Sequence, residues 1–297
     1  MTPTSNKCAF GRHESFALRY TKGFQAKTEI FNSDQATVEL GVGKNMVKSI
    51  QYWLKACQIM DENRQPTLIG SAIFDDNGFD PYLEDESTIW LIHWLLSTNS
   101  ELATVVYWFF NHFHKPEFSA QEAQTALGDF AKETLKSKTS LKTIHNDALL
   151  LLRMYTQNRT SKRTPIEESL DSPLSLLRLI SHSPDGRQYF SHSESRPQLS
   201  LGVLGYAITD LLNRKQVNTL PIEEILCSNC GGIAPGTVFR LTENDLIFHL
   251  EKLVNYIPSV LEIRETAGIH QLYRLETIDP IEFLNKHYAD VNKDIAA

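Results

Sequence analysis

A cluster of carboxylates is the feature of the sequence best suited to metal chemistry. The segment DDNGFDPYLEDEST, residues 75–88, contains Asp80, Glu84 and Asp85 at positions i, i+4 and i+5. Carboxylate oxygens suit Mg²⁺, and a bound Mg²⁺ can offset the charge of a phosphodiester during its cleavage. The spacing predicts that these acids bind Mg²⁺ and act in catalysis. The alternative is structural: if Pro81 begins a helix, Glu84 and Asp85 lie in its first turn, where the helix dipole favours negative charge.

A second polar group stands close to the N-terminus. The segment FGRHESF places Arg12, His13 and Glu14 next to one another. His13 or Glu14 could act as a general base, and Arg12 could contact a phosphate group. We therefore count His13 and Glu14 as catalytic candidates and Arg12 as a DNA-binding candidate. The alternative is the polar start of a surface helix.

Residues 33–52, SDQATVELGVGKNMVKSIQY, match the pattern of about twenty residues that is typical of a helix-turn-helix unit. Gly41 stands where the turn between the helices requires a positive φ. Lys side chains can bind guanine edges or phosphates, and Asn can recognise adenine. The face predicted to meet DNA carries Lys44, Asn45, Lys48, Ser49 and Tyr52. The alternative is a pair of packed helices with no role in DNA binding.

Charge is distributed unevenly along the chain. The formal net charge is −7 and the isoelectric point is about 5.8, so the overall balance does not point to a nucleic-acid partner. Residues 61–86 contain eight acids and one Arg, whereas residues 131–163 contain eight Lys or Arg and two acids. Such runs usually form solvated faces, but a basic face can also contact DNA phosphates. We predict phosphate contacts for Lys142 and Arg153.

Cysteine usage and hydropathy indicate a reducing compartment. The chain has four cysteines among 297 residues, which is too few for a disulfide framework. The pair Cys227 and Cys230 lacks the second pair that a zinc site requires. No apolar leader segment follows the N-terminus, and no apolar stretch is long enough to cross a bilayer. We therefore expect a cytoplasmic protein with no membrane partner.

Hydrophobic periodicity predicts a mainly α fold with three domains. Residues 8–80 are predicted to form a winged helix-turn-helix domain, with short strands within residues 66–74 as the wing. Residues 81–215 are predicted to form a helical middle domain. Residues 216–280 are predicted to form a winged-helix-like unit, in which an amphipathic helix precedes a β-hairpin.

Local signals support several helices of the middle domain. Residues 88–97 and 101–113 are apolar on nearly all sides, so both helices are expected to be buried. Ser119 and Glu122 have the spacing of a capping box that opens a helix. Ser140 is expected to cap the next helix, which should extend to about Tyr155.

Four longer segments of the sequence are FGRHESFALRY, ELGVGKNMVKSIQYWLKA, NGFDPYLEDESTIWLIHWLL and APGTVFRLTEN. Together they resemble the SspB-like proteins, which accompany bacterial DNA phosphorothioation and anti-phage gene clusters. The resemblance extends from about residue 8 to about residue 275. The chain departs from the family at Ala234, where a Ser-Pro-Gly sequence is usual, and this change affects only a turn.

The resemblance implies a role in sulfur modification of the DNA backbone. SspB-like proteins are described as Mg²⁺-dependent nickases that open one strand for sulfur insertion. They act beside a cysteine desulfurase, an ATPase and an ATP-pyrophosphatase-like protein, which are therefore the expected partners. Asp80, Glu84 and Asp85 stand in the family's D-P-Y-L-E-D stretch, whereas Lys44, Asn45 and Lys48 stand in its G-V-G-K-N-M-V-K stretch.

The sequence thus leads to one main hypothesis and two rivals. The main hypothesis is a double-stranded DNA-binding component of a phosphorothioation and anti-phage defence system that acts as a Mg²⁺-dependent nickase. The first rival is a non-catalytic, sequence-specific adaptor or repressor that recruits partner proteins, in which the acids only cap a helix. The second rival is a protein scaffold that does not bind DNA. Under any of these three hypotheses, the protein could also act as a homodimer.

Overall fold

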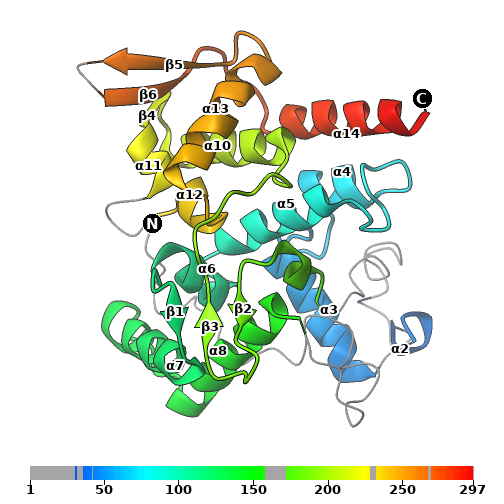
Figure 1. Ribbon diagram of the computed structural model, residues 1–297. Coiled ribbons are helices and arrows are strands. Elements are labelled where there is room, and N and C mark those ends of the chain that lie inside the picture. Colours follow the sequence, from blue (N-terminus) through cyan, green and yellow to red (C-terminus); the bar gives the residue numbers. More distant parts are fainter. Residues whose placement is uncertain are drawn as a thin grey trace. The chain divides into compact units, whose positions relative to one another are not determined.

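The computed structural model describes residues 31, 36–41, 43–157, 172–227, 232–266 and 269–296. The chain groups into two compact units, Met1–His192 and Ser193–Ala297, called unit 1 and unit 2 below. This division differs from the three predicted segments, because residues 8–80 and most of 81–215 share unit 1. Both units are mainly helical, and each contains one small antiparallel sheet, which confirms the predicted fold class (Figure 1).

Unit 1 is built around two buried helices. Its elements are α2 (Ala36–Glu39), α3 (Lys44–Ala56), α4 (Leu68–Phe74), α5 (Glu86–Ser97), α6 (Thr104–Asn111), β1 (Glu117–Phe118), α7 (Ala120–Asp129), a π-helical turn (Phe130–Thr134), α8 (Leu141–Tyr155), a 3₁₀ turn (Pro173–Leu177), β2 (Ser181–His182) and β3 (Tyr189–Phe190). All of α6, and all of α5 after Glu86, is buried, as the apolar sequences predicted. The three strands pair in the order β1-β3-β2.

The predicted wing of the N-terminal domain is wrong, because residues 66–74 do not form strands. Thr67 caps the helix α4, and its hydroxyl accepts a hydrogen bond from the Gly70 amide at 3.1 Å. The same hydroxyl donates to the Gln58 carbonyl at 2.7 Å. A Cβ atom at Gly70 would overlap the Ile59 carbonyl, so glycine allows α4 to lie against the chain that follows α3. The short apolar run therefore forms a helix, because Thr67 caps it and Gly70 lets it lie close to Ile59.

Unit 2 consists of helices around a three-stranded sheet. Its elements are α10 (Leu201–Lys215), β4 (Thr219–Pro221), α11 (Ile222–Leu226), α12 (Pro235–Val238), α13 (Glu243–Tyr256), β5 (Leu261–Thr266), β6 (Ile269–Arg274) and α14 (Ile281–Ala296). The strands pair in the order β4-β6-β5. The predicted helix and β-hairpin are confirmed by α13, β5 and β6. The winged-helix assignment of this unit stays a prediction.

Helix α10 packs closely on α14, and glycine makes this approach possible. A Cβ atom at Gly205 would overlap the buried ring of Phe283. We therefore expect Gly205→Ala to lower the free energy of unfolding of unit 2 by about 1–3 kcal/mol, despite the higher helix propensity of Ala. Thermal unfolding followed by circular dichroism measures this change.

The matched control is Gly128→Ala in α7. A Cβ atom there would meet only the Leu141 side chain, at an ordinary 3.6 Å. This variant should therefore stabilise unit 1 by about 0.5–1 kcal/mol. All four tryptophans of the chain lie in unit 1, so their fluorescence follows that unit alone. Equal effects of the two substitutions would contradict the role assigned to Gly205.

Candidate nucleic-acid interface

The start of α3 is exposed in the described part of the predicted DNA-binding unit. Gly41 adopts φ +64° between α2 and α3, as the turn pattern predicted. Gly43 is the N-cap of α3, no side chain caps the helix, and its first turn contains no acid. The dipole of a helix N-terminus favours an anion.

Three of the predicted DNA-binding residues lie at this helix start. Lys44, Asn45 and Lys48 are all exposed. Within the described part of the chain, neither lysine forms an ion pair. Their charges are therefore available to a phosphate group, and Asn45 is available to a base edge.

Ser49 and Tyr52 do not belong to this exposed face. Ser49 is 5% exposed, and the Tyr52 hydroxyl donates a hydrogen bond to the Leu102 carbonyl. The predicted contact of these two residues with DNA stays a prediction, and the structure does not place them beside Lys44, Asn45 and Lys48. The helical repeat of about 3.6 residues turns them towards the side of α3 that carries Ile50 and Trp53, both 3% exposed.

The C-terminal end of α3 is tied to the buried helices of unit 1. The Asn99 side-chain amide donates to the Ala56 carbonyl at 3.0 Å, and the Gln58 amide donates to the Leu95 carbonyl at 2.6 Å. Because Asn99 and Leu95 belong to α5 and the residues that follow it, these bonds fix the direction of α3.

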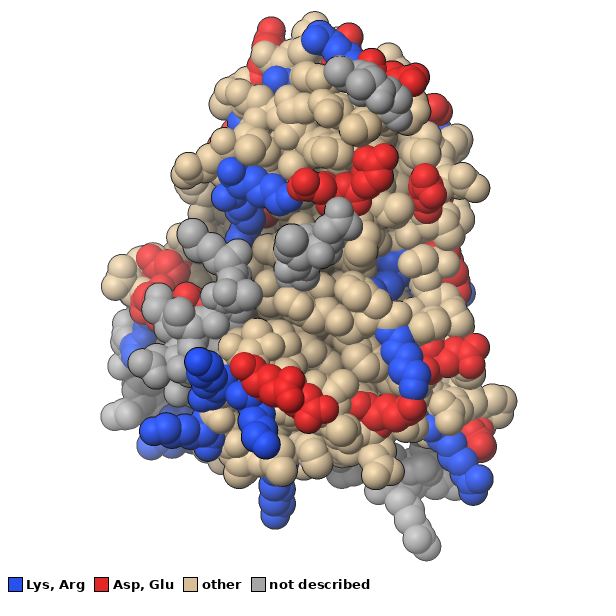
Figure 2. All heavy atoms as spheres, turned by 90° about the vertical axis from the view of Figure 1, so that its left-hand side faces the viewer, with Lys and Arg blue, Asp and Glu red and all other residues tan. Residues whose placement is uncertain are grey.

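A second basic surface lies on α7, α8 and the turn between them. Lys142 and Arg153 are exposed, and they lie eleven residues apart on α8. Eleven residues make about three helical turns, so both side chains extend from the same side of α8, about 16 Å apart. Lys132, Lys136 and Lys138 are also exposed in the connection between the helices. Figure 2 shows Lys and Arg side chains gathered at the lower left, in the part of the molecule where Figure 1 places α7 and α8.

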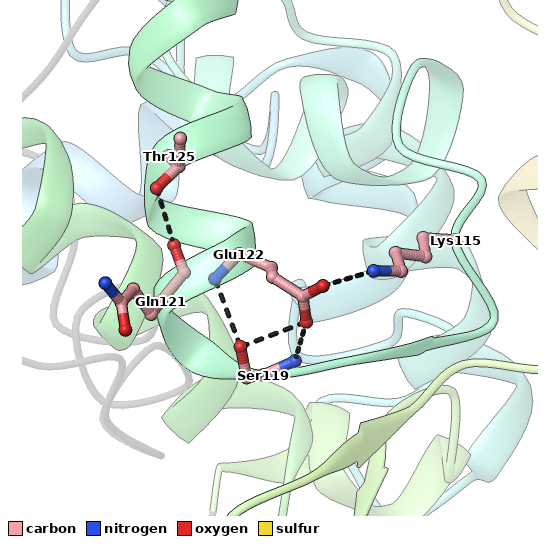
Figure 3. Close-up of polar contacts among 5 residues, drawn as sticks. All are labelled: Lys115, Ser119, Gln121, Glu122 and Thr125. Atoms are coloured by element: carbon pink, nitrogen blue, oxygen red, sulfur yellow. Dashed lines mark hydrogen bonds and ion pairs between the residues drawn. The ribbon is translucent and has the colours of Figure 1, made fainter.

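A capping box fixes the first turn of α7. The Ser119 hydroxyl accepts a hydrogen bond from the Glu122 amide, and the Glu122 carboxylate accepts one from the Ser119 amide at 2.7 Å (Figure 3). Lys115 also donates to the Glu122 carboxylate. The predicted capping box is therefore confirmed.

We expect this arrangement to give Glu122 an unusual titration. The hydrogen bond from Lys115, followed by the bonds from Ser119, lowers the pKa of Glu122 from 4.5 to about 2. A carboxyl whose pKa is lower in the folded state stabilises the fold above its unfolded pKa. This stabilisation is lost as the pH falls from about 4.5 to about 2. An NMR titration of the Glu122 carboxyl carbon measures the pKa directly.

The Lys115→Met variant is the control for this titration. It removes the largest cause of the shift and should move the pKa of Glu122 upward, towards its ordinary value. Titration of Glu122 near pH 4.5 in the unaltered protein would contradict the capping geometry.

The predicted acidic site has a different geometry from a metal centre. Asp80 is 7% exposed. Its carboxylate accepts hydrogen bonds from the Glu84 amide at 2.8 Å, the Asp85 amide at 3.0 Å and the Thr88 hydroxyl at 2.6 Å. Asp85 is the N-cap of α5 and accepts from the Ser87 amide at 2.7 Å. Glu84 is exposed.

The structure does not bring Asp80, Glu84 and Asp85 together as a Mg²⁺ site. Asp80 holds the turn before α5 through three hydrogen bonds, and Asp85 caps the first turn of that helix. Among the described residues, no three His, Cys, Asp or Glu side chains are grouped so that they could share a metal ion. Asp85 is thus the N-cap of α5 and Asp80 holds the turn before it, but α5 begins at Glu86 and not at Pro81, so Glu84 lies outside its first turn.

Arg12, His13 and Glu14, the other catalytic and DNA-binding candidates, lie outside the described residues. Their predicted roles stay predictions. No described helix combines the length and the apolar composition needed to span a bilayer.

Sequence reasoning missed a group of titratable side chains in the core of unit 1. His93 has no exposed surface, and its Nδ1 lies 2.8 Å from the Tyr155 hydroxyl. Burial raises the pKa of the Cys57 thiol and raises that of Tyr155 well above its ordinary value. Neutral groups that solvent cannot reach suit a structural role better than catalysis.

Unit 2 contains a buried ionic group that the sequence also concealed. Arg196 and Arg240 are 6% and 5% exposed. Burial, together with the nearby charge of Arg196, lowers the pKa of Arg240 to about 10. Asp245, in the first turn of α13, accepts a hydrogen bond from the Arg196 amide at 2.9 Å. This group ties the segment before α10 to the start of α13.

Comparisons with known proteins agree with this fold. No significant match is found among curated protein sequences. The solved structure of SspB is 25% identical in sequence, with a TM-score of 0.79, over 95% of this chain and 88% of that chain. The structure of magnesium ion-bound SspB is also 25% identical, with a TM-score of 0.81, over 98% of this chain and 91% of that chain. The predicted resemblance to SspB is thereby confirmed. The family model of DUF4007, described as a protein of unknown function, matches residues 10–288, so the chain is an SspB-like protein that belongs to the DUF4007 family.

Proposed function

We propose that this protein binds double-stranded DNA as a component of a bacterial DNA phosphorothioation system. The observation that carries the proposal is the exposed start of α3, where Lys44, Asn45 and Lys48 stand at a helix N-terminus without a side-chain cap. The similarity to SspB supports the link to sulfur modification of DNA. The basic surface of α7 and α8 would add contacts to the phosphate backbone, which position a protein without reading sequence.

Salt dependence tests DNA binding. We expect a fluorescent duplex to bind the full chain with an affinity that falls steeply as the salt concentration rises, because each phosphate contact releases counterions. Fluorescence anisotropy at several salt concentrations gives the slope. A protein that acts only as a scaffold would show no binding to the duplex at low salt.

We propose further that the protein, beside its partners, nicks one strand in the presence of Mg²⁺. The family resemblance and the similarity to magnesium ion-bound SspB support this step. The geometry of Asp80 and Asp85 does not, so we derive no step of the reaction from them or from Glu84. A non-catalytic adaptor or repressor is the second candidate, and the capping roles of Asp80 and Asp85 favour it.

A plasmid assay separates the two candidates. Supercoiled plasmid is incubated with the protein in Mg²⁺ or EDTA, alone and with the desulfurase, ATPase and ATP-pyrophosphatase-like partners. A nickase gives open-circular product only with Mg²⁺. We expect Glu84→Ala to nick as well as the unaltered protein, because its exposed carboxylate stands apart from any metal-ligand group among the described residues. Loss of nicking in this folded variant would restore the predicted acidic site.

A further inference from the structure

Unit 2 contains a groove of about 670 Å³ that the sequence analysis did not predict. Helix α11, helix α13 and strand β5 form its walls, and β6 contributes one residue. Its lining comprises three residues of α11, five of α13, three of β5 and His270 of β6.

The groove is elongated along α13. Its lining runs from Glu243 to Asn255, which corresponds to about 18 Å at 1.5 Å per residue. Glu243, Ile247, Glu251 and Val254 follow one another at helical spacing and therefore share one face of α13. A length of about three helical turns fits another helix better than it fits a compact small molecule.

The lining of the groove contains both apolar side chains and carboxylates. Leu226, Ile247, Val254 and Ile263 are half-buried, so their apolar surface is only partly covered. Partial burial of this kind leaves surface that a partner's apolar side chains can cover.

The charged residues of the lining are all acidic. Glu223, Glu243, Glu251 and Glu262 line the groove, and no Lys or Arg does. Among the described residues, only Glu262 of these four forms an ion pair, with Arg264. Unit 2 as a whole carries 14 acids and nine Lys or Arg. Figure 2 shows acidic side chains in the upper part of the face, with some Lys and Arg side chains and an uncharged surface beside them.

We propose that this groove binds a basic amphipathic helix of a partner protein. The apolar side chains of the groove would receive the apolar face of that helix, and the glutamates would pair with Lys or Arg along its edges. The negative charge of the lining disfavours nucleic acid at this site. The proposal is independent of DNA binding through α3, because the two surfaces have opposite charge and belong to different units.

Selection from a peptide library tests the proposal. Random peptides of about sixteen residues, long enough for four helical turns, are displayed on phage and selected on the full-length protein. We expect the selected peptides to have Leu or Ile at helical spacing with Lys or Arg beside them. Failure to enrich such peptides, or enrichment of acidic peptides, would overturn the proposal.

Binding of the best selected peptide is then measured by fluorescence anisotropy. Glu243→Gln/Glu251→Gln should weaken it at least tenfold at low salt, and the difference should shrink at high salt. Glu282→Gln in α14, which does not line the groove, removes an exposed acid and should leave binding unchanged. Circular dichroism confirms that each variant is folded.

Two further outcomes count against the groove. A scrambled peptide of the same composition should bind much more weakly, so equal binding would show attraction by charge alone. Duplex DNA should bind the double variant as well as the unaltered protein. Stronger DNA binding by the double variant would show that duplex DNA lies close to this surface, which would contradict the proposal.

Discussion

Replacing Asp80 with Ala is expected to lower the free energy of unfolding of unit 1 by about 2–4 kcal/mol. The substitution leaves the Glu84 amide, the Asp85 amide and the Thr88 hydroxyl without their shared acceptor. Because the site is buried, water cannot fully replace this acceptor. Urea unfolding followed by tryptophan fluorescence measures the change, since all four tryptophans lie in unit 1.

Glu84→Ala is the matched control for Asp80→Ala. Both changes remove a carboxylate from the same segment, but the Glu84 side chain is exposed. We expect its effect on the free energy of unfolding to stay within about 0.5 kcal/mol. Similar stability of the two variants would contradict the capping role of Asp80.

This pair of variants also bears on the nickase hypothesis. Asp80→Ala can lose activity simply because the start of α5 is disordered in the variant. Activity data on Asp80 are therefore informative only at temperatures where the variant is shown to be folded. Activity data on Glu84 are free of this complication.

The double substitution Lys44→Ala/Lys48→Ala is expected to weaken duplex binding by about tenfold or more at moderate salt. Each lysine that contacts a phosphate adds close to one unit to the slope of log K against log salt, so the slope should decrease by about two. Fluorescence anisotropy at several salt concentrations measures both quantities. Because both side chains are exposed, stability should be unaffected.

Two other double variants test whether the loss of duplex binding is specific to the start of α3. Lys252→Ala/Lys293→Ala removes the same charge from exposed positions of unit 2 and should change binding little. Lys142→Ala/Arg153→Ala should weaken binding to all duplexes alike, because phosphate contacts carry no sequence information. Unchanged binding after Lys44→Ala/Lys48→Ala would show that the DNA face lies elsewhere.

Substitution of Asn45 tests whether this residue contributes to the choice of DNA sequence. An Asn that recognises adenine contributes to the choice of sequence more than to non-specific affinity. The stability and salt slope of an Asn45→Ala variant should therefore resemble those of the unaltered protein, while its preference among duplex sequences becomes weaker.

Local sequence signals accounted for much of the fold, because they act over a few residues. Apolar residues on all sides of α5 and α6 required burial, and the Ser119 capping box satisfied backbone donors within its own turn. The Gly41 turn and the hairpin of β5 and β6 also depend on neighbouring residues alone. The resemblance to SspB came from long segments of sequence and was confirmed by the fold.

Other features depend on contacts between distant segments, which a periodic pattern does not contain. Residues 66–74 became α4 because Thr67 bonds the chain after α3 and Gly70 lies against Ile59. Tyr52 was turned inward by the Leu102 carbonyl, fifty residues away. The spacing of Asp80, Glu84 and Asp85 suits a metal or a helix cap, and only the fold shows that Asp85 is the N-cap of α5 and that Asp80 is buried beside Thr88.

The groove of unit 2 is another feature that a periodic sequence pattern does not predict. Its acids come from α11, α13 and β5, which are separated in sequence and meet only when the helices pack on the sheet. Periodicity correctly predicted α13 and the hairpin, but it carries no information on which faces they leave open. Elements are determined by interactions between near neighbours, whereas a surface that binds a partner is created by the packing of whole elements.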